Sequence, residues 1–336
     1  MSRLTVFAPG LFAELLEQSL GHIDGARWPA LAMLLARASE QPLASDALEP
    51  NLVALFGSGA GESLSLTDLT ASIDCENKPR PGLMRADPVH LRAEPNHILL
   101  FNDPSVMPSA IEADAMLETL NQGLPELGLF RGNNPARWYF RPNVAGFAGT
   151  APPSGVNGRS ITNYLPRNQR AQAFVQLMNE AQMLLHDAPS NIERETQGIS
   201  PINSIWIWGL ELTQSATGNA PDIVVGDDVL TAALAQQFDI EWRAEHSATE
   251  ILSKIAVSDV DALVVIGSPT GSLTRDRPTI SVDDFEKTWG ISILHSLRRF
   301  RLNEFILVTD QQSFSLTPWS LFKLWRNRYS TSGPPA

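Results

Sequence analysis

The sequence predicts an α/β protein with a mostly parallel sheet, helices on both faces of that sheet, and a small inserted α+β domain. In the C-terminal half, short apolar runs that favour strands alternate with helical segments, which is typical of a parallel sheet covered on both sides. A block around residues 83–150 instead runs strand, helix, strand, and this order indicates an insert.

The sheet domain is expected to be discontinuous in sequence. Its predicted strands are residues 3–10, 204–209, 221–227, 261–268 and 304–310. Helices are expected between the later strands, and an early one over 28–40, where Pro29 suits a first helical turn. We therefore expect a core of residues 1–82 and 190–330, an insert of residues 83–189 with a return helix, and a flexible tail over 331–336.

The insert contains the clearest helix of the chain. Residues 169–189 place apolar side chains at helical spacing, and Pro189 is expected to end the helix. That stripe is Phe174, Leu177, Met178, Ala181, Leu184 and Leu185. The remaining expected elements are strands over 97–103 and 137–140 and a helix over 108–124.

Charge and composition exclude several classes of function. Lysine and arginine total 25 against 37 acids, giving a net charge of -12. Nucleic acids and anionic membrane surfaces require a basic footprint, so we expect neither as a partner. The single cysteine, Cys75, rules out an internal disulfide and a thiolate metal site. No signal peptide or membrane span is evident, which favours a soluble, cytoplasmic protein.

The strand ends carry little catalytic chemistry. Ligands of open α/β sheets bind at the carboxyl ends of the strands. The obvious acids there are Asp310, at the end of FILVTD, and Glu211 after the 204–209 strand, and no histidine lies at any strand end. Asp310 is interpreted either as a cap for the turn that follows or as a metal ligand. No histidine pair has the spacing of a local metal site.

The segment MRADPVHLR concentrates charged side chains in one short stretch. If it is extended, Arg85 and Asp87 share one face, and His90 and Arg92 share the other. Arginines suit bidentate binding of phosphate or carboxylate, so this is a candidate anion-recognition segment. A salt-bridge network at a domain junction explains the same residues.

A second candidate group lies on the long helix. Asn179, Gln182 and His186 fall on one side at spacings of three and four, beside the apolar stripe. They line either a ligand pocket or a polar seam against a neighbouring loop. Trp206 and Trp208 share one strand face and are expected in the core, with ligand stacking as the alternative.

Several segments, taken in order, resemble archaeal-type cofactor-independent phosphoglycerate mutases of the alkaline phosphatase superfamily. HDAPSNIERETQGISPINSIWIWG is similar to the segment that leads from the inserted domain of that family back to its core. The likeness extends from about residue 83 to 312 and includes DALVVIGSPTG and EFILVTD. LRADPVHL, NEAQMLLH and NSIWIWG together resemble the bacterial Rpf E-type regulatory proteins. The matching positions are Asn191, Arg194, Gly198, Asn203, Trp206, Trp208 and Gly209.

The resemblance also implies what is missing. Active mutases of this family carry Asp-Gly after the first strand, a metal-bound serine followed by Asp, and Asp-His after the last strand. Here these places are Ala8-Pro9-Gly10, the weakly matching Ser45-Asp46, and Asp310-Gln311. A further acid-rich motif that ends in His is replaced by residues 268–271, SPTG. A pair of Mn²⁺ or Zn²⁺ ions needs most of these ligands.

We therefore expect a catalytically inactive relative with a regulatory or small-anion-binding role and no cofactor. Its ligand, phosphorylated or carboxylated, would lie between core and insert near Arg85, Arg92, His186 and Arg194, with Asn203 close by. One alternative is a metal-dependent phosphotransferase or mutase with relocated ligands, in which Ser45 and Asp310 are the weak catalytic candidates and a Mn or Zn pair is bound. Another alternative is a protein–protein interaction module.

Overall fold

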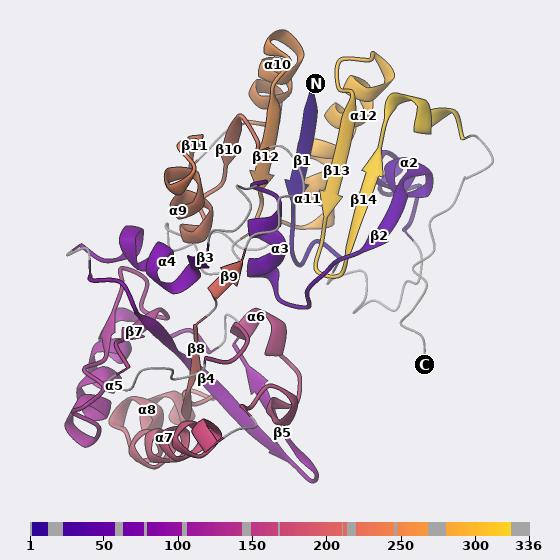
Figure 1. The fold of residues 1–336 in the computed structure, drawn as a ribbon. Coiled ribbons are helices and arrows are strands. Elements are labelled where there is room, and N and C mark those ends of the chain that lie inside the picture. Colours follow the sequence, from indigo (N-terminus) through magenta and orange to yellow (C-terminus); the bar gives the residue numbers. More distant parts are fainter. Residues whose placement is uncertain are drawn as a thin grey trace. The chain divides into compact units, whose positions relative to one another are not determined.

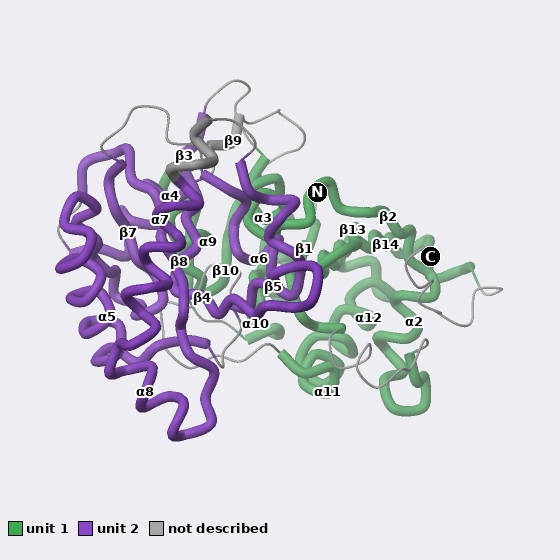
Figure 2. Tube along the Cα trace, turned by 90° about the horizontal axis from the view of Figure 1, so that it is seen from below, with its two compact units in different colours: residues 1–58, 216–336 green, residues 59–215 purple. Residues whose placement is uncertain are grey.

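The computed structural model describes most of the chain. The described residues are 2–12, 23–57, 63–76, 79–102, 106–142, 149–166, 169–209, 211–213, 220–244, 247–267 and 280–323. The chain forms two compact units, coloured separately in Figure 2: unit 1 comprises residues 1–58 and 216–336, and unit 2 comprises residues 59–215.

Unit 1 is built on a mixed sheet with the order β11-β10-β12-β1-β13-β14-β2 (Figure 1). The first five strands of this order run parallel. At one edge β14 pairs antiparallel with β13, and β2 pairs antiparallel with β14. The expected α/β class with a mostly parallel sheet is therefore confirmed. The strands are β1 (Arg3–Phe7), β2 (Ser39–Pro42), β10 (Ile223–Val225), β11 (Glu241–Arg243), β12 (Asp261–Val265), β13 (Glu304–Val308) and β14 (Gln312–Leu316).

Helices of unit 1 bury one face of this sheet in a large apolar core. Leu4 and Val6 of β1 pack there with Leu31 of α2, Ile251 of α10 and Ile293 of α12. The alternate strand residues are buried on the opposite face of the sheet. Helices α3 and α9 contact each other, and neither contributes a side chain to the first apolar core. The helices are α2 (Pro29–Arg37), α3 (Leu48–Ala54), α9 (Val229–Gln237), α10 (Ala248–Ser258), α11 (Val282–Phe285), η2 (Glu286–Gly290), α12 (Ile291–Arg298) and η3 (Pro318–Phe322).

Unit 2 has its own antiparallel sheet, β5-β4-β7-β6, with β8 also paired to β4. The long strand β4 pairs with β8 and β7 in its first half and with β5 in its second half. The strands are β3 (Ser63–Ser65), β4 (Met84–Glu94), β5 (His97–Phe101), β6 (Phe130–Arg131), β7 (Trp138–Phe140), β8 (Ser204–Trp208) and β9 (Glu211–Thr213). The helices are α4 (Leu66–Asp74), α5 (Ala110–Gly123), α6 (Pro153–Val156), η1 (Ile161–Asn163), α7 (Gln169–His186) and α8 (Pro189–Thr196).

The apolar stripe expected on the long helix is buried against this second sheet. Phe174 meets the ring of Trp206 edge-on, with ring centroids 5.9 Å apart. Leu177, Met178 and Leu185 join the same core, whereas Leu184 is half-buried. The helix α7 ends at His186, and Pro189 starts the next helix, α8, because proline suits the first helical turn.

The expected boundaries between core and insert need correction. SIWIWG was predicted as a strand of the core sheet, but residues 204–208 form β8, which pairs antiparallel with residues 85–89 of β4. Residues 63–65 pair with residues 211–213 in the same way. These two pairings place residues 59–82 and 190–215, expected in the core, in unit 2.

Two further expectations concern the tail 331–336 and the segment 268–271, and both lie outside the described residues. In the part of the chain that the structure describes, no helix combines the length and the apolar character needed to cross a membrane.

Candidate functional site

The carboxyl ends of the parallel strands in unit 1 meet at one edge of the sheet, which we call the rim. Sheets of this kind bind their ligands at such an edge. β1 reaches the rim with Ala8-Pro9-Gly10, which carry no side-chain donor, and β13 reaches it with Asp310. The residues that follow Gly267 after β12 lie outside the described part of the chain.

Asp310 holds the turn that follows β1. Its two carboxylate oxygens accept hydrogen bonds from the backbone N–H of Gly10, at 3.0 and 2.8 Å. Gly10 has a φ of 77°, a left-handed conformation that favours glycine. Burial raises the pKa of Asp310, although these backbone hydrogen bonds act in the opposite direction. Asp310 thus acts as a capping acid, but for the turn after β1 rather than for the segment that follows Asp310 itself.

Two acids at the rim were missed in the sequence. Asp227 and Asp228 follow β10 at the same edge, and both are buried. Asp228 caps α9, since its Oδ1 accepts from the N–H groups of Leu230 and Thr231, both at 3.0 Å. The signal was present, because the apolar run IVV ends on Gly-Asp-Asp, a strand end followed by a helix cap. Glu211 belongs to β9, outside this sheet.

The described rim residues do not fit a pair of divalent ions. In the sheet order, β12 and β1 separate β10 from β13, so three strand spacings of about 4.8 Å place the two sets of acids about 14 Å apart. The ions of a two-metal site lie about 4 Å apart and share their ligands. Among the described residues, no group of three or more His, Cys, Asp or Glu side chains could hold a metal ion.

Ser45 lies near the same end of the sheet as Asp310. The N–H of Leu43 donates to the carbonyl of Gln311 at 3.1 Å, which brings the segment leading to Ser45 to the rim. The Ser45 hydroxyl accepts from the N–H of Ala47 at 3.1 Å, in the turn before α3. Both weak catalytic candidates, Ser45 and Asp310, therefore lie at one edge of the sheet. The side chain of each accepts a backbone hydrogen bond that stabilises a turn.

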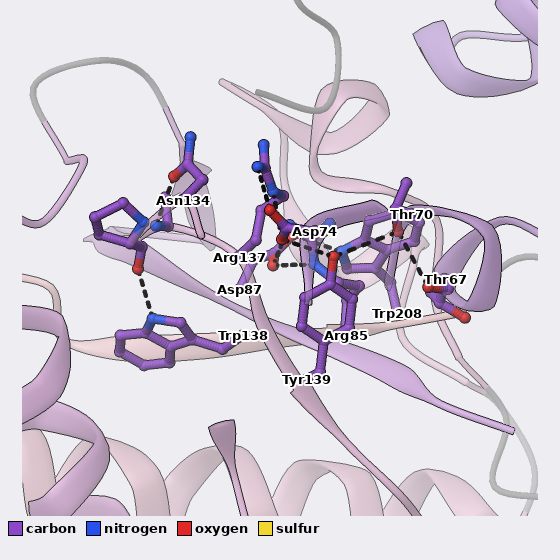
Figure 3. A network of polar contacts seen from close by, with 12 residues as sticks. Thr67, Thr70, Asp74, Arg85, Asp87, Asn134, Arg137, Trp138, Tyr139 and Trp208 are labelled. Atoms are coloured by element: carbon purple, nitrogen blue, oxygen red, sulfur yellow. Dashed lines mark hydrogen bonds and ion pairs between the residues drawn. The ribbon is translucent and has the colours of Figure 1, made fainter. Parts of the chain in front are cut away.

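A buried polar network occupies the centre of unit 2 (Figure 3). Asp74, at the end of α4, accepts from Arg137 Nε at 2.8 Å and Nη2 at 2.6 Å, and from the Tyr139 hydroxyl at 3.1 Å. Arg85 Nε donates to Asp87 at 2.6 Å, and the indole of Trp208 donates to Asp87 at 2.7 Å. These residues come from α4, β4, β8 and the β7 segment. Sequence analysis placed Arg85 and Asp87 on one face and expected Trp208 in the core, but it did not connect them with Asp74, Arg137 or Tyr139.

The network is internally neutral, with two acids and two arginines. Burial alone would raise the pKa of Asp74, but the hydrogen bonds and charge of Arg137, with help from Arg85 and Tyr139, bring that pKa below its ordinary value. Burial raises the pKa of Asp87 even though Arg85 and Trp208 favour its ionised form.

Aromatic rings complete the surroundings of Arg85. Its guanidinium lies 5.1 Å from the ring of Tyr139 and 5.2 Å from that of Trp208. Arg85 Nη1 is buried without a hydrogen-bond partner among the described residues, and these ring faces offer it a cation–π environment instead. Neither Arg85 nor Asp87 is open to a ligand, and their salt bridge lies within unit 2, whereas the alternative to anion recognition placed such a network at a domain junction.

The other side of β4 fastens the chain that returns from α8. The side-chain amide of Asn203 pairs with the backbone of Leu91 as a neighbouring strand would. Its oxygen accepts from Leu91 N at 2.7 Å, and its nitrogen donates to Leu91 O at 2.9 Å. His90 Nδ1 lies 2.8 Å from the Pro201 carbonyl oxygen. Arg92 lies over the ring of Phe101 at 4.6 Å and pairs with Glu94. These predicted ligand residues bind neighbouring elements of unit 2.

Arg194 is also engaged within unit 2. It is buried in α8, where Nη1 donates to Glu112 of α5 at 3.0 Å and Nε donates to the carbonyl of Ser200 at 2.9 Å. Asn191 spans the same corner through hydrogen bonds to Leu185 and Ile202. Gly198, at φ 71°, ends the helix. Residues that carried the family resemblance therefore hold the architecture of this corner.

Asn179, Gln182 and His186 share one side of α7 as expected. Asn179 and His186 are exposed and Gln182 is half-buried, and among the described residues the side chains of these three find no hydrogen-bond partner. They form a polar border beside the apolar stripe.

An open groove of unit 2 lies over the corner between α5 and α8. This groove has a volume of about 900 Å³. Its walls combine apolar side chains with the acids Glu112 and Glu193, and Arg194 lies at its base. The lining residues are Met107, Ser109, Ile111, Glu112, Ser190, Glu193, Arg194, Gln197, Gly198, Ile199 and Ser200.

Comparison with known proteins links parts of the chain to one enzyme family. No family model matches the chain. It is 40% identical over 58 residues to a probable 2,3-bisphosphoglycerate-independent phosphoglycerate mutase of Geobacter sulfurreducens, covering 17% of this chain and 14% of that protein. It is 31% identical over 104 residues to the corresponding mutase of Methanosarcina barkeri, covering 30% and 26%. The chain thus spans about a quarter or less of the length of these relatives.

Solved structures give a wider but weaker likeness. The cofactor-independent phosphoglycerate mutase from Thermoplasma acidophilum aligns over 99% of this chain and 91% of its own, with a TM-score of 0.38 and 14% identity. The PH0037 protein from Pyrococcus horikoshii aligns over 94% and 87%, with a TM-score of 0.43 and 12% identity. Structural similarity this low does not define a shared fold, so the α/β assignment is based on the sheet of unit 1 itself.

Proposed function

We propose that this protein is a catalytically inactive relative of the cofactor-independent phosphoglycerate mutases that acts by binding. The observation that carries the proposal is the use of Asp310. Both of its carboxylate oxygens accept from the backbone of Gly10, and the neighbouring β1 ends on Ala8-Pro9-Gly10 without a metal-ligating side chain. The partial identity to named mutases supports the relationship.

A phosphoglycerate mutase assay tests the inactivity. The full-length protein, given Mn²⁺, Zn²⁺ or Mg²⁺, is expected to interconvert 3-phosphoglycerate and 2-phosphoglycerate no faster than buffer, as followed by ³¹P NMR. Ser45→Ala and Asp310→Asn are the matched variants, because a turnover that survives both comes from a contaminant. Metal-dependent turnover that both variants abolish would establish the alternative, a phosphotransferase with relocated ligands.

The binding role is better supported for a protein surface than for a small anion. Arg85 and Arg194, the buried arginines of the expected anion site, already pair with Asp87 and Glu112. The groove over α5 and α8 is open, partly apolar and of mixed charge, as protein-binding surfaces are. We therefore favour a regulatory role exercised through protein contact, which also agrees with the sequence resemblance to Rpf E-type regulatory proteins.

A further inference from the structure

Unit 1 exposes a cluster of three aromatic side chains, Phe300, Trp319 and Phe322, which we call the aromatic patch. They are 52%, 72% and 60% exposed. The ring centroids of Phe300 and Trp319 are 5.7 Å apart, and those of Trp319 and Phe322 are 5.8 Å apart. Single exposed apolar residues are ordinary, but a contiguous aromatic cluster marks an interaction surface.

The short helix η3 fixes the direction of two of these rings. In a 3₁₀ helix, side chains three residues apart lie above one another, so Trp319 and Phe322 share a face. Pro318 and Leu321 are buried, and Arg37 Nη1 donates to the carbonyl of Leu321, which ties η3 to α2. The rings are therefore displayed on a helix that is anchored from behind.

Phe300 has a left-handed backbone conformation in which glycine is the favoured residue. It follows α12 with a φ of 54°, and the N–H groups of Phe300 and Arg301 donate to the carbonyls of Leu297 and Ser296. This is the Schellman ending of a helix, whose left-handed residue is usually glycine because other side chains are strained there. A strained, exposed phenylalanine whose ring contacts Trp319 indicates a function other than stability.

Basic residues are sequence neighbours of the aromatic patch. Arg299 and Arg301 flank Phe300, and Lys323 follows Phe322. None of these three forms an ion pair with another described residue, and one acid, Glu304, lies in the same stretch. On a chain with a net charge of -12, this local positive charge favours an acidic, apolar surface as the partner.

The chain itself carries a surface of that description in unit 2. The groove over α5 and α8 presents Ile111, which is 83% exposed, together with Met107 and Ile199. Its acids are the exposed Glu193 and the half-buried Glu112, which pairs with Arg194. Its volume of about 900 Å³ admits aromatic side chains. Patch and groove are thus both partly apolar, and the groove lining has one acid more than it has arginines, a charge opposite in sign to that of the basic side chains beside the patch.

We propose that the aromatic patch of one copy docks into the α5–α8 groove of a second copy. Two different surfaces meet in such a contact, so it is heterologous and can add further copies. Because the rings are already partly buried, docking covers only part of the about 150–250 Å² of each side chain, which places the interface at the small end of specific contacts and makes the association concentration-dependent. This proposal does not depend on whether the protein is an enzyme.

Sedimentation velocity of the full-length protein over a range of concentrations tests the proposal. We expect the sedimentation coefficient of the wild type to rise with concentration. Phe300→Gly and, in the groove, Ile111→Arg should each weaken the association by about tenfold or more. Val257→Arg is the matched control for Ile111→Arg, because Val257 is 85% exposed on α10, outside both surfaces, and it should behave as wild type.

A mixing experiment separates this contact from any other. Phe300→Gly protein keeps an intact groove and Ile111→Arg protein keeps an intact patch, so an equimolar mixture should form a dimer that does not grow. Phe300→Gly should not lower the melting temperature, since glycine suits that backbone. The proposal fails if the wild type stays monomeric, if the two surface variants associate as wild type does, or if the mixture does not dimerise.

Two other occupants of the patch would also overturn the proposal. Binding of the wild type, but not of Phe300→Gly, to phosphatidylglycerol vesicles in the absence of self-association would make the patch a membrane contact. A lower melting temperature for Phe300→Gly without any change in association would show that the patch is covered by its own chain.

Discussion

Single buried residues show how Arg85 and Asp87, which were expected in an anion site, are used inside unit 2. Asp74, Arg85, Asp87 and Arg137 neutralise one another out of contact with water, so the charges that suggested ligand recognition stabilise unit 2 instead. Ion pairs without water depend on both members, because removal of one leaves the other charge uncompensated.

Asp74→Asn tests this reading of the network. The change removes the carboxylate that accepts from two nitrogens of the buried Arg137 guanidinium, and we expect it to lower the free energy of unfolding by about 3–5 kcal/mol at pH 7. Because the folded pKa of Asp74 lies below its ordinary value, its ionised form stabilises the fold above about pH 4, and this contribution is lost as the pH falls through the folded pKa.

Urea unfolding at several pH values measures the effect. The difference in free energy of unfolding between the wild type and Asp74→Asn should become smaller as the pH falls below about 4. Glu40→Gln, on an exposed strand residue, is the control and should match the wild type. A difference that stays constant from pH 7 to pH 3 would contradict the assigned role of Asp74.

At the scale of elements, sequence patterns predicted which segments form strands and helices better than they predicted pairing. SIWIWG has the apolar continuity of a buried strand, and β8 is one. The sheet to which β8 belongs depends on its pairing with residues 85–89, which lie more than 100 positions earlier. Local periodicity does not encode such a distant pairing. The ion pair of Arg137 was missed for the same reason, since its partner Asp74 lies 63 positions earlier in the sequence.

The N-terminus of α5 gives a prediction at this scale. The Ser109 hydroxyl and the Glu112 carboxylate form a capping box, and Glu112 also accepts from Arg194 of α8. Ser109→Ala should lower the free energy of unfolding by about 1 kcal/mol, through loss of a cap. Glu112→Ala should cost about 2–3 kcal/mol, because Arg194 then also loses its charged acceptor. Equal losses for the two variants in urea unfolding would show that the link between helices contributes nothing.

At the scale of the whole molecule, the sequence indicated a sheet domain interrupted by an insert, and the structure has two units with one interrupted by the other. The boundaries lie at other positions because β3 with β9 and β4 with β8 bring the flanking segments together. The acids after β10 were overlooked, yet the sheet order places them far from Asp310. The central claim concerns this rim, which lacks the converging ligands of a two-metal enzyme.

Metal binding measured by isothermal titration calorimetry tests that claim most directly. Mn²⁺ and Zn²⁺ titrated into the metal-free, full-length protein should show no tight binding of two equivalents, and Asp310→Asn should give the same curve. Two equivalents bound tightly by the wild type, and lost together in Asp310→Asn or Asp227→Asn, would contradict the account.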